Sequence, residues 1–311
     1  MSSPISHVVV TPVYEDVEAF ARLCRELRAA LGAGTHVVAV DDGSVRRPVD
    51  PQAIRAAGLS GTVLRLRRNV GHQRAIAIGL GHVAETLPNH RVVVMDSDGE
   101  DVPATIPELL IALDAGDVDV CVAVRTARVE TLRFKLFYLV YKLLFRLMTG
   151  RWIAFGNFMA LTPAAVRRLA AMRETWTHVA ATVLVSKLRV ATRPLSRGPR
   201  YAGQSKMNFA GLVLHGFRAV MVFTEDVLVR TGIVSAAIAL SSMVASVVSV
   251  VLKSSGHATP GWFSVALGIL LILFLQTSAL TLMTLLLTGL VRGGEAGIPD
   301  HRVLIDEAIE V

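Results

Sequence analysis

The stretch RVVVMDSDGEDVP (91–103) decides the fold, because a short apolar run passes at once into a cluster of acidic residues. Three valines and a methionine are typical of a buried strand. Asp96, Asp98, Glu100 and Asp101 then follow within six positions. Dense negative charge at the end of a buried strand is costly unless something positive lies beside it. We therefore expect a binding site at the carboxyl end of this strand.

Outward from this strand, residues 1–130 alternate between β-rich runs and amphipathic runs. Strands are expected at 7–14, 36–42, 62–68, 91–96 and 118–125, and helices at 17–31, 72–87 and 106–115. Alternating strands and helices predict an α/β fold with a mostly parallel sheet that is covered on both faces. Ligands of such sheets bind beyond the carboxyl ends of the strands.

Polar motifs follow four of these strands, so they gather at one edge of the predicted sheet. The motifs are TPVYED, DDGS (41–44), RNVGHQR (68–74) and DSDGED. Asp and Gly favour turns, which explains DDGS alone but not four such ends together. Asp96 and Asp98 flank Ser97, so their carboxylates can converge on one point. Hard oxygen ligands suit Mg²⁺ or Mn²⁺, which keep waters and share a substrate diphosphate.

Other common site chemistries find no support in the sequence. No Cys/His spacing indicates zinc, no GxxxxGK[ST] loop indicates a nucleotide hydrolase, and no GxSxG indicates an acyl-transfer nucleophile. Cys24 and Cys121 are isolated and are interpreted as packing residues rather than a disulfide. The formal charge of +7 is explained by anionic lipid and phosphates, and no nucleic-acid motif is present.

The C-terminal third has the pattern of a transmembrane hairpin. From Thr231 to Val291 the only charged side chain is Lys253. The apolar runs 227–252 and 262–291 each exceed the roughly 20 residues that cross a bilayer. A buried helical pair in a soluble core is the alternative. The N-terminal residues do not resemble a signal peptide, and basic residues flank both runs, so we expect the soluble part at the cytoplasmic face of the inner membrane.

Two further segments have the composition of interface helices. The first segment, TLRFKLFYLVYKLLFRLMTG (131–150), mixes basic and aromatic residues in an amphipathic pattern that suits a membrane interface. An ordinary surface helix that packs its apolar side on the sheet is the alternative. LVLHGFRAVMVF (212–223) is a second candidate. The expected organisation is a catalytic domain at 1–210, a juxtamembrane helix at 211–226, two membrane helices at 227–292 and a cytoplasmic tail at 293–311.

Taken in order, six motifs resemble a known family. They are TPVYED, VAVDDGS, NVGHQRAIAIGL, MDSDGEDVP, GNFMAL (156–161) and RYAGQSKMN (200–208). They look like the inverting, family-two nucleotide-sugar glycosyltransferases, which have the Rossmann-like GT-A fold. The two C-terminal spans make the chain most similar to the polyprenyl-phosphate glycosyltransferases, the branch of dolichyl-phosphate mannose synthase.

The resemblance implies roles for matching residues. Asp96 and Asp98 match the DxD pair that binds the metal and the donor diphosphate. The other residues that it places around the donor are Pro12, Tyr14, Glu15, Asp41 or Asp42, Asn69, Gly71, Arg74 and Ser97, with Arg200, Gly203, Ser205 and Lys206 from the R-x-x-G-x-S-K loop. Arg125, Arg133 and Asn157 are the expected acceptor contacts, although surface solvation would also explain the two arginines.

The chain departs from the family at two places. Asn157 stands where some members have Asp, and Glu100-Asp101-Val102 replaces the usual Gln-Asp-Pro. Asn cannot accept a proton, so either the acceptor is already an anion or another group is the base. Asp101 and His178 are the candidates for that base.

The resulting hypothesis is a metal-dependent, membrane-anchored transferase that moves one sugar from a UDP- or GDP-linked donor to polyprenyl phosphate. Two alternatives remain: transfer to a hydroxyl of a lipid-linked glycan or glycolipid, and a non-catalytic scaffold. The resemblance also makes a homo-oligomer possible, whereas nucleic acid is not an expected partner.

Overall fold

The computed structural model describes residues 4–125, 132–152, 155–201, 209–257, 259, 261–293 and 297–311. The chain divides into two compact units. The first contains Met1–Tyr141, Trp152–Val222 and Gly297–Val311, and the second contains Lys142–Arg151 and Phe223–Ala296. The C-terminal tail therefore belongs to the same unit as the N-terminal strands, although the two are far apart in the sequence.

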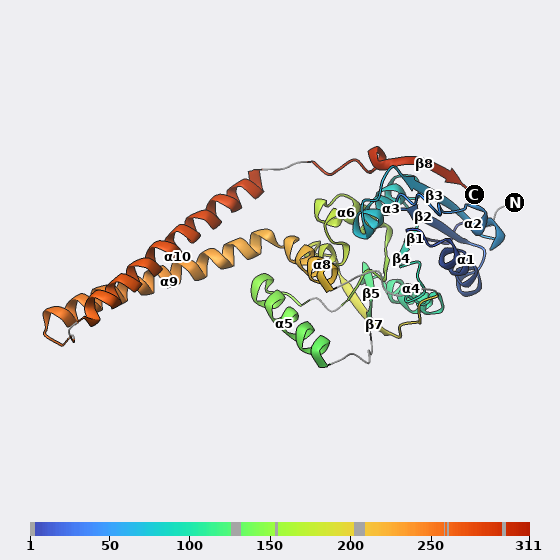
Figure 1. The fold of residues 1–311 in the computed structure, drawn as a ribbon. Coiled ribbons are helices and arrows are strands. Elements are labelled where there is room, and N and C mark those ends of the chain that lie inside the picture. Colours follow the sequence, from blue (N-terminus) through green and yellow to red (C-terminus); the bar gives the residue numbers. More distant parts are fainter. Residues whose placement is uncertain are drawn as a thin grey trace. The chain divides into compact units, whose positions relative to one another are not determined.

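An eight-stranded sheet in the order β7-β5-β6-β4-β1-β2-β3-β8 forms the centre of the first unit (Figure 1). The strands are β1 (His7–Val13), β2 (Thr35–Asp41), β3 (Ser60–Leu66), β4 (Arg91–Val94), β5 (Val120–Arg125), β6 (Met159–Leu161), β7 (Val190–Leu195) and β8 (Ile305–Glu310). Strands β1 to β4 pair in parallel, whereas β6 runs antiparallel to β4 and β5, and β8 runs antiparallel to β3. The predicted α/β fold with a mostly parallel sheet is confirmed.

Helices cover both faces of this sheet. They are α1 (Val17–Leu31), α2 (Gln52–Ala56), α3 (His72–Thr86), α4 (Ile106–Asp114), α6 (Pro163–Ala170) and α7 (Val179–Val185), with 3-10 turns at Pro103–Thr105, Arg173–Trp176 and His301–Leu304. Helix α8 (Phe209–Met221) packs on α7. Successive side chains of a strand point to opposite faces. Val9 of β1 accordingly joins the hydrophobic cluster under α1 and α4, while Val8 and Val10 join the cluster under α3 and α6.

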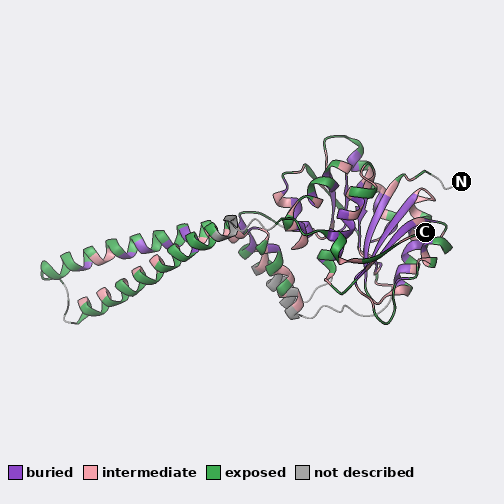
Figure 2. Ribbon diagram, turned by 90° about the horizontal axis from the view of Figure 1, so that it is seen from above, coloured by how far each residue is buried: buried purple, intermediate pink, exposed green. Residues whose placement is uncertain are grey.

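Burial follows this layering, since the central strands are mostly buried, whereas the edge strands β7 and β8 and the two long C-terminal helices are largely exposed (Figure 2). The expected strands and helices of residues 7–125 are all present, with ends that differ by a few residues. Cys24 and Cys121 are both buried and free, as packing residues would be.

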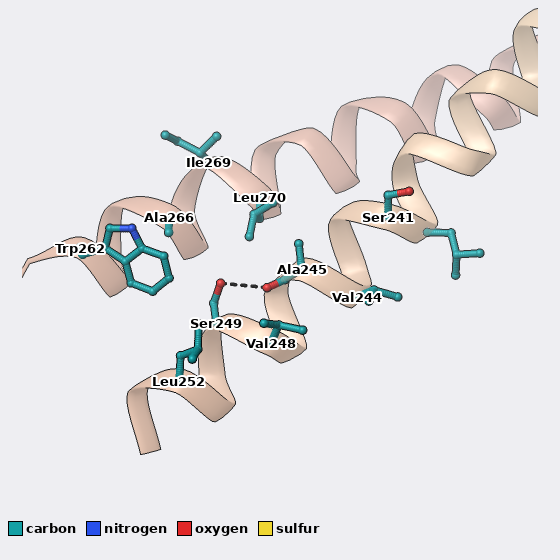
Figure 3. A pocket seen from close by; sticks show the side chains of 11 residues that line it. Ser241, Val244, Ala245, Val248, Ser249, Leu252, Trp262, Ala266, Ile269 and Leu270 are labelled. Atoms are coloured by element: carbon teal, nitrogen blue, oxygen red, sulfur yellow. Dashed lines mark hydrogen bonds between the residues drawn. The ribbon is translucent and has the colours of Figure 1, made fainter. Parts of the chain in front are cut away.

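The second unit holds two long apolar helices, α9 (Thr224–Ser254) and α10 (Trp262–Gly293). Both are long and apolar enough to cross a membrane, with a mean hydropathy of 2.2 over their most apolar windows. They pack against each other through small residues of α9 such as Gly232, whose Cα lies against Thr284. An open apolar groove of about 800 Å³ runs between them near Trp262, where the Ser249 hydroxyl donates back to the Ala245 carbonyl (Figure 3).

Helix α5 (Leu132–Thr149) occupies most of the predicted segment 131–150. Leu139, Leu143 and Leu147 repeat every four residues and are exposed by 61% or more of their surface. A row of exposed leucines beside Lys142 and Arg146 is the pattern of an interfacial helix.

Candidate functional site

The acidic stretch forms a tight turn immediately after β4. The Asp96 backbone N–H donates to Asp101 Oδ2 at 3.0 Å, and the Glu100 N–H donates to Asp98 Oδ1 at 2.9 Å. Gly99 has a φ of +89°, and a Cβ there would lie 2.6 Å from the Tyr201 ring. Any side chain at this position would therefore collide with a packed aromatic ring in a backbone region that already disfavours it.

Two arginines of the segment after β7 neutralise this turn. The Arg200 Nη2 lies 2.9 Å from Asp98 Oδ2, and its Nε lies 3.2 Å from Glu100 Oε1. Arg197 forms a second ion pair with Glu100. Burial raises the pKa of Asp98, and the neighbouring Asp96 carboxylate raises it further, while Arg200 acts in the opposite direction. The negative charge of Asp98 and Glu100 is thus offset by Arg197 and Arg200.

Backbone hydrogen bonds hold these arginines beside the turn. The Gly198 N–H donates to the Glu100 carbonyl at 3.0 Å, and the Tyr201 N–H donates to the Asp98 carbonyl at 2.8 Å. The Tyr201 hydroxyl also donates to Glu26 Oε2 of α1 at 2.6 Å. The segment that carries Arg200 is therefore fixed to the DxD turn from both its backbone and its side chains.

His72, the first residue of α3, links the DxD turn to the GNF motif. Its Nε2 lies 3.2 Å from Asp96 Oδ1 and 3.1 Å from Asn157 Nδ2. Asn157 Oδ1 is buried and has no hydrogen-bond partner, and the buried Asp96 Oδ1 has the ion-pair contact with His72 but accepts no hydrogen bond. Two unsatisfied buried oxygens beside one imidazole indicate that the site is built for a further electropositive group.

The next residue of the same motif has a structural task. Gln73 is buried, and its Oε1 accepts a hydrogen bond of 2.7 Å from the Val179 N–H at the start of α7. Within the RNVGHQR motif, His72 therefore contacts the acidic turn, and Gln73 binds the first residue of α7.

Asp41 and Asp42 are buried and are engaged with backbone amides. Asp41 accepts from the Ser44 and Val49 N–H groups at 2.9 and 2.8 Å. Asp42 accepts from the N–H groups of Val70 and Gly71 at 2.7 and 3.0 Å. Burial raises the pKa of Asp42, and these two donors lower it. Asp42 thus fixes the loop that leads into His72.

Glu15 acts in the same way on the loop after β2. Its carboxylate accepts from the N–H groups of Val45, Arg46 and Arg47 at 2.8 to 2.9 Å. These donors, with that of Arg46 first, lower the pKa of Glu15. Glu15 adopts a φ of +51°, which is uncommon for a residue with a side chain. The structure therefore assigns Glu15 an anchoring contact in addition to the nucleotide contact expected from the resemblance.

The remaining expected site residues differ in how far the structure describes them. Pro12 and Ser97 are buried, whereas Tyr14, Asn69 and Arg74 are exposed at the same edge of the sheet. The side chains of Arg125 and Arg133 and the residues Gly203, Ser205 and Lys206 lie outside the described part of the chain. Their roles stay predictions.

His178, a candidate base, caps a helix. Its Nδ1 accepts from the Ala181 N–H at 3.2 Å, and its Nε2 lies 3.2 Å from His215 Nε2 of α8. The two rings are tilted by 43° with centroids 4.6 Å apart. Burial, with a smaller effect of His215, lowers the pKa of His178 to about 3. Both ring nitrogens of His178 are engaged, so the arrangement favours a helix-capping role.

This histidine predicts a pH dependence of stability. Its folded-state pKa of about 3 lies below the ordinary value of 6.5. Between these values the unfolded chain binds a proton that the folded chain does not, so stability falls as the pH drops from about 6.5 towards 3. Above that window the contribution is complete. His178→Asn retains a good capping side chain and removes this titration.

Thermal unfolding of the wild type and of His178→Asn tests this expectation. Between about pH 7.5 and about pH 5 the wild type should lose roughly 2 kcal/mol more stability than the variant, or about 4–8 °C in Tm. Equal losses in the two proteins would contradict the buried neutral histidine.

Sequence reasoning missed His72, Arg197 and His215. A signal was present for His72, which directly follows Gly71 in a motif already placed at the site. Arg197 stands three residues before the expected Arg200. Nothing in the sequence paired His215 with His178, because that contact depends on how α8 packs on α7.

The residues present fit a divalent cation that is shared with a substrate. Within the described ranges, no three His, Cys, Asp or Glu side chains are arranged to hold a metal by themselves. Mg²⁺ is usually bound by one or two carboxylates together with substrate phosphates. Asp96 Oδ1, buried and without a hydrogen-bond partner, is a suitable hard oxygen beside Asp98.

The α/β sheet, with an acidic pair after β4 and arginines beside it, is the arrangement expected from the resemblance to nucleotide-sugar glycosyltransferases. The sequence matches the family model "Glycosyl transferase family 2" over residues 8–176. The chain belongs to this family and is a glycosyltransferase.

Similar proteins extend this finding. An undecaprenyl-phosphate 4-deoxy-4-formamido-L-arabinose transferase of Salmonella paratyphi A is 28% identical over 262 residues, which cover 81% of this chain and 78% of that protein. Glucosyl-3-phosphoglycerate synthase of Mycobacterium tuberculosis, crystallised with Mn²⁺ and UDP, gives a TM-score of 0.53 at 14% identity and covers 72% of this chain and 80% of its own. A further structure of that enzyme with Mg²⁺ and UDP gives 0.51 at 14% identity over 72% and 79% of the two chains. These structures confirm the GT-A fold.

Proposed function

We propose that this glycosyltransferase moves one sugar from a nucleotide-sugar donor to polyprenyl phosphate at the cytoplasmic face of the membrane. The observation that carries the proposal is the similarity to an undecaprenyl-phosphate sugar transferase over 81% of the chain. This similarity continues beyond the family-two domain, which ends at residue 176. Two membrane-length helices in the second unit suit an acceptor that resides in lipid.

The geometry supports donor binding at the edge of β4. Asp96 and Asp98 would hold a Mg²⁺ or Mn²⁺ ion, which neutralises the charge that develops on the departing diphosphate. Arg197 and Arg200, already beside this pair, supply two more positive groups for the same phosphates. Guanidinium groups are well matched to phosphate oxygens.

An anionic acceptor needs no general base, which fits the helix-capping contact of His178. Asp101, the other candidate base, accepts from the Asp96 N–H, and its role as a base stays a prediction. A phosphate monoester has a second pKa of about 6 and is largely ionised at neutral pH. Its oxygen forms the new bond to the anomeric carbon while the bond from that carbon to the diphosphate breaks, and the nucleoside diphosphate leaves. No proton has to be removed, so Asn157 and a neutral His178 are compatible with the reaction.

Chain connectivity supports placing both ends of the hairpin on one side of the membrane. Helix α8 of the first unit is followed directly by α9, and the chain re-enters the first unit at Gly297, soon after α10. A pair of spans that starts and ends at one folded unit returns to its starting side. Basic residues near both ends make that side the cytoplasm.

The purified full-length chain in detergent tests this function. Incubated with undecaprenyl phosphate, Mn²⁺ and a panel of labelled UDP- and GDP-sugars, it should form a polyprenyl-phosphate sugar with at least one donor. Chelation of the metal should lower the rate by at least about a hundredfold, as expected for loss of an electrostatic stabiliser. Transfer to a glycolipid hydroxyl, with none to the phosphate, would overturn the proposal.

A further inference from the structure

Helix α8 presents an apolar face to the outside of the protein. Leu214 and Phe217, three residues apart, expose 52% and 61% of their surfaces. Residues at this spacing lie on the same side of a helix. The membrane-length helix α9 begins at Thr224, shortly after α8 ends. An apolar helix face directly before a membrane span is expected to rest in the bilayer surface.

The opposite side of α8 packs on the catalytic unit. Ala219 is 1% exposed, and the Gly216 carbonyl accepts a hydrogen bond of 3.4 Å from the Tyr141 hydroxyl. His215 lies on this side and stacks against His178 of the buried α7 cap. Arg218 lies one turn after His215, between the packed and the exposed sides.

Hydrogen bonding fixes the tautomer of His215. Because His178 Nδ1 accepts from the Ala181 N–H, the proton of the neutral His178 ring must be on Nε2. That Nε2–H donates to His215 Nε2, 3.2 Å away. The single proton of a neutral His215 is therefore on Nδ1. Burial, first, and then the charges of His72 and Arg218 lower the pKa of His215, which favours the neutral ring.

Contacts link His215 to the DxD turn: it meets His178 at the start of α7, the next residue, Val179, donates to Gln73, and the preceding His72 contacts Asp96. The Asp96 carboxylate raises the pKa of His215, while His72, which contacts Asp96, lowers it. The Nδ1–H of His215 is thus a hydrogen-bond donor on a helix whose other face is apolar and exposed.

We propose that the Nδ1–H of His215, together with the guanidinium of Arg218, binds the phosphate monoester of the membrane-embedded acceptor. This inference rests on the proposed function and names residues for its acceptor site. An acceptor phosphate must reach the donor sugar while its hydrocarbon chain stays in lipid. Helix α8 has an exposed apolar face suited to the bilayer, and it carries His215 near the elements that hold the DxD turn, so it meets both requirements. A charge-assisted hydrogen bond from a fixed donor is stronger than one between neutral groups.

A matched pair of substitutions tests the tautomer. The amide nitrogen of Asn takes roughly the place of His Nδ1, and that of Gln takes the place of Nε2. His215→Gln should raise the KM for undecaprenyl phosphate about tenfold to a hundredfold, the effect of losing one hydrogen bond to a charged group. His215→Asn should stay within about threefold of wild type by the same reasoning. Affinity for UDP with Mn²⁺ should be unchanged in both.

One further variant tests the second proposed phosphate contact, and another serves as a control. Arg218→Gln should also raise the KM for the lipid without changing UDP affinity. His90→Gln, which changes a histidine just before β4 at the opposite end of the strand from Asp96, is the matched control and should leave both values unchanged. Thermal unfolding of each variant shows whether the fold is retained.

Equilibrium binding separates this inference from the proposed function. Nanodiscs that contain wild-type protein should bind undecaprenyl phosphate and discriminate against undecaprenol, which lacks the phosphate, and His215→Gln should lose this discrimination. If the wild type binds the phosphate but transfers no sugar, only the proposed function fails. Unchanged lipid KM and binding in folded His215→Gln, equal effects of Asn and Gln, or a loss confined to UDP affinity would each overturn the role of His215.

Discussion

Replacement of Asp98 by asparagine is expected to lower the rate of sugar transfer by about a hundredfold to a thousandfold, the range seen when one electrostatic stabiliser of a transition state is removed. Asp98 Oδ2 lies 2.9 Å from Arg200 Nη2, and Asp98 Oδ1 accepts from the Glu100 N–H. Asparagine keeps the size of the side chain and an oxygen for the N–H, but it removes the charge. The metal and Arg200 would both lose their counter-charge.

The stability of the Asp98→Asn protein should change little. Burial and the neighbouring Asp96 already raise the pKa of Asp98, which shows that its charge is held at a cost in the folded state. Thermal unfolding should therefore give a Tm close to that of wild type, and the loss of rate would then belong to chemistry rather than folding.

Asp114→Asn is the matched control. Asp114 ends α4 and pairs at 2.6 Å with Arg91, the first residue of β4, so it lies at the edge of the sheet opposite to the site. An exposed ion pair contributes little to stability. Transfer by Asp114→Asn should equal that of wild type, measured with saturating donor and lipid. An Asp98→Asn enzyme within about tenfold of wild type would be incompatible with a donor site at the DxD turn.

The sequence sufficed for the parts of the structure that depend on local pattern. The strands β1, β2, β3, β4 and β5 and the main helices between them follow from the apolar periodicity, and the acidic cluster after β4 indicated where a positive group is needed. Parallel strands bring their carboxyl ends to one edge whatever the side chains are. The gathering of four polar motifs was therefore predictable without knowledge of any single contact.

Contacts between distant segments were not predictable in the same way. The sequence HRVLIDEAIEV (301–311) does not show the clear alternation of a half-buried strand, because β8 lies at the edge of the sheet and most of its side chains remain exposed. Its partner β3 is more than 200 residues upstream, so no local signal links them. The same holds for His178 and His215, which meet only when α8 packs on α7.

Deletion of residues 297–311 is expected to destabilise the catalytic unit although these residues lie outside the family-two match, which ends at residue 176. Strand β8 pairs with β3 from Thr62↔Glu310 to Leu66↔Ile305, and the Arg67 N–H donates to the Leu304 carbonyl at 3.0 Å. Each cross-strand pair contributes up to about 1 kcal/mol, so the loss should be roughly 1–5 kcal/mol.

Side chains of the tail add to this ladder. The Thr62 hydroxyl donates to the Glu310 carboxylate at 3.1 Å, and the same hydroxyl contacts buried His36. Arg302 pairs with Glu85 of α3 at 2.9 Å. Without the tail, β3 would become an exposed sheet edge, which is a template for pairing with other chains. The truncated protein should therefore aggregate as well as unfold at a lower temperature.

The Glu307→Gln variant distinguishes the stability that comes from strand pairing from the stability that comes from the ion pair of β8. This change removes only the exposed ion pair of Glu307 with Arg65, at 3.0 Å, and should alter stability by less than about 1 kcal/mol. Thermal unfolding and size-exclusion chromatography of both variants in detergent measure the difference. A truncated chain that stays monodisperse with the Tm of wild type would show that β3 needs no partner.

A large effect of Glu307→Gln would instead assign the stabilisation to charge rather than to the strand. The expected ranking, deletion far above substitution, follows because backbone pairing and burial of the β3 edge involve the whole segment, whereas the ion pair is largely solvated.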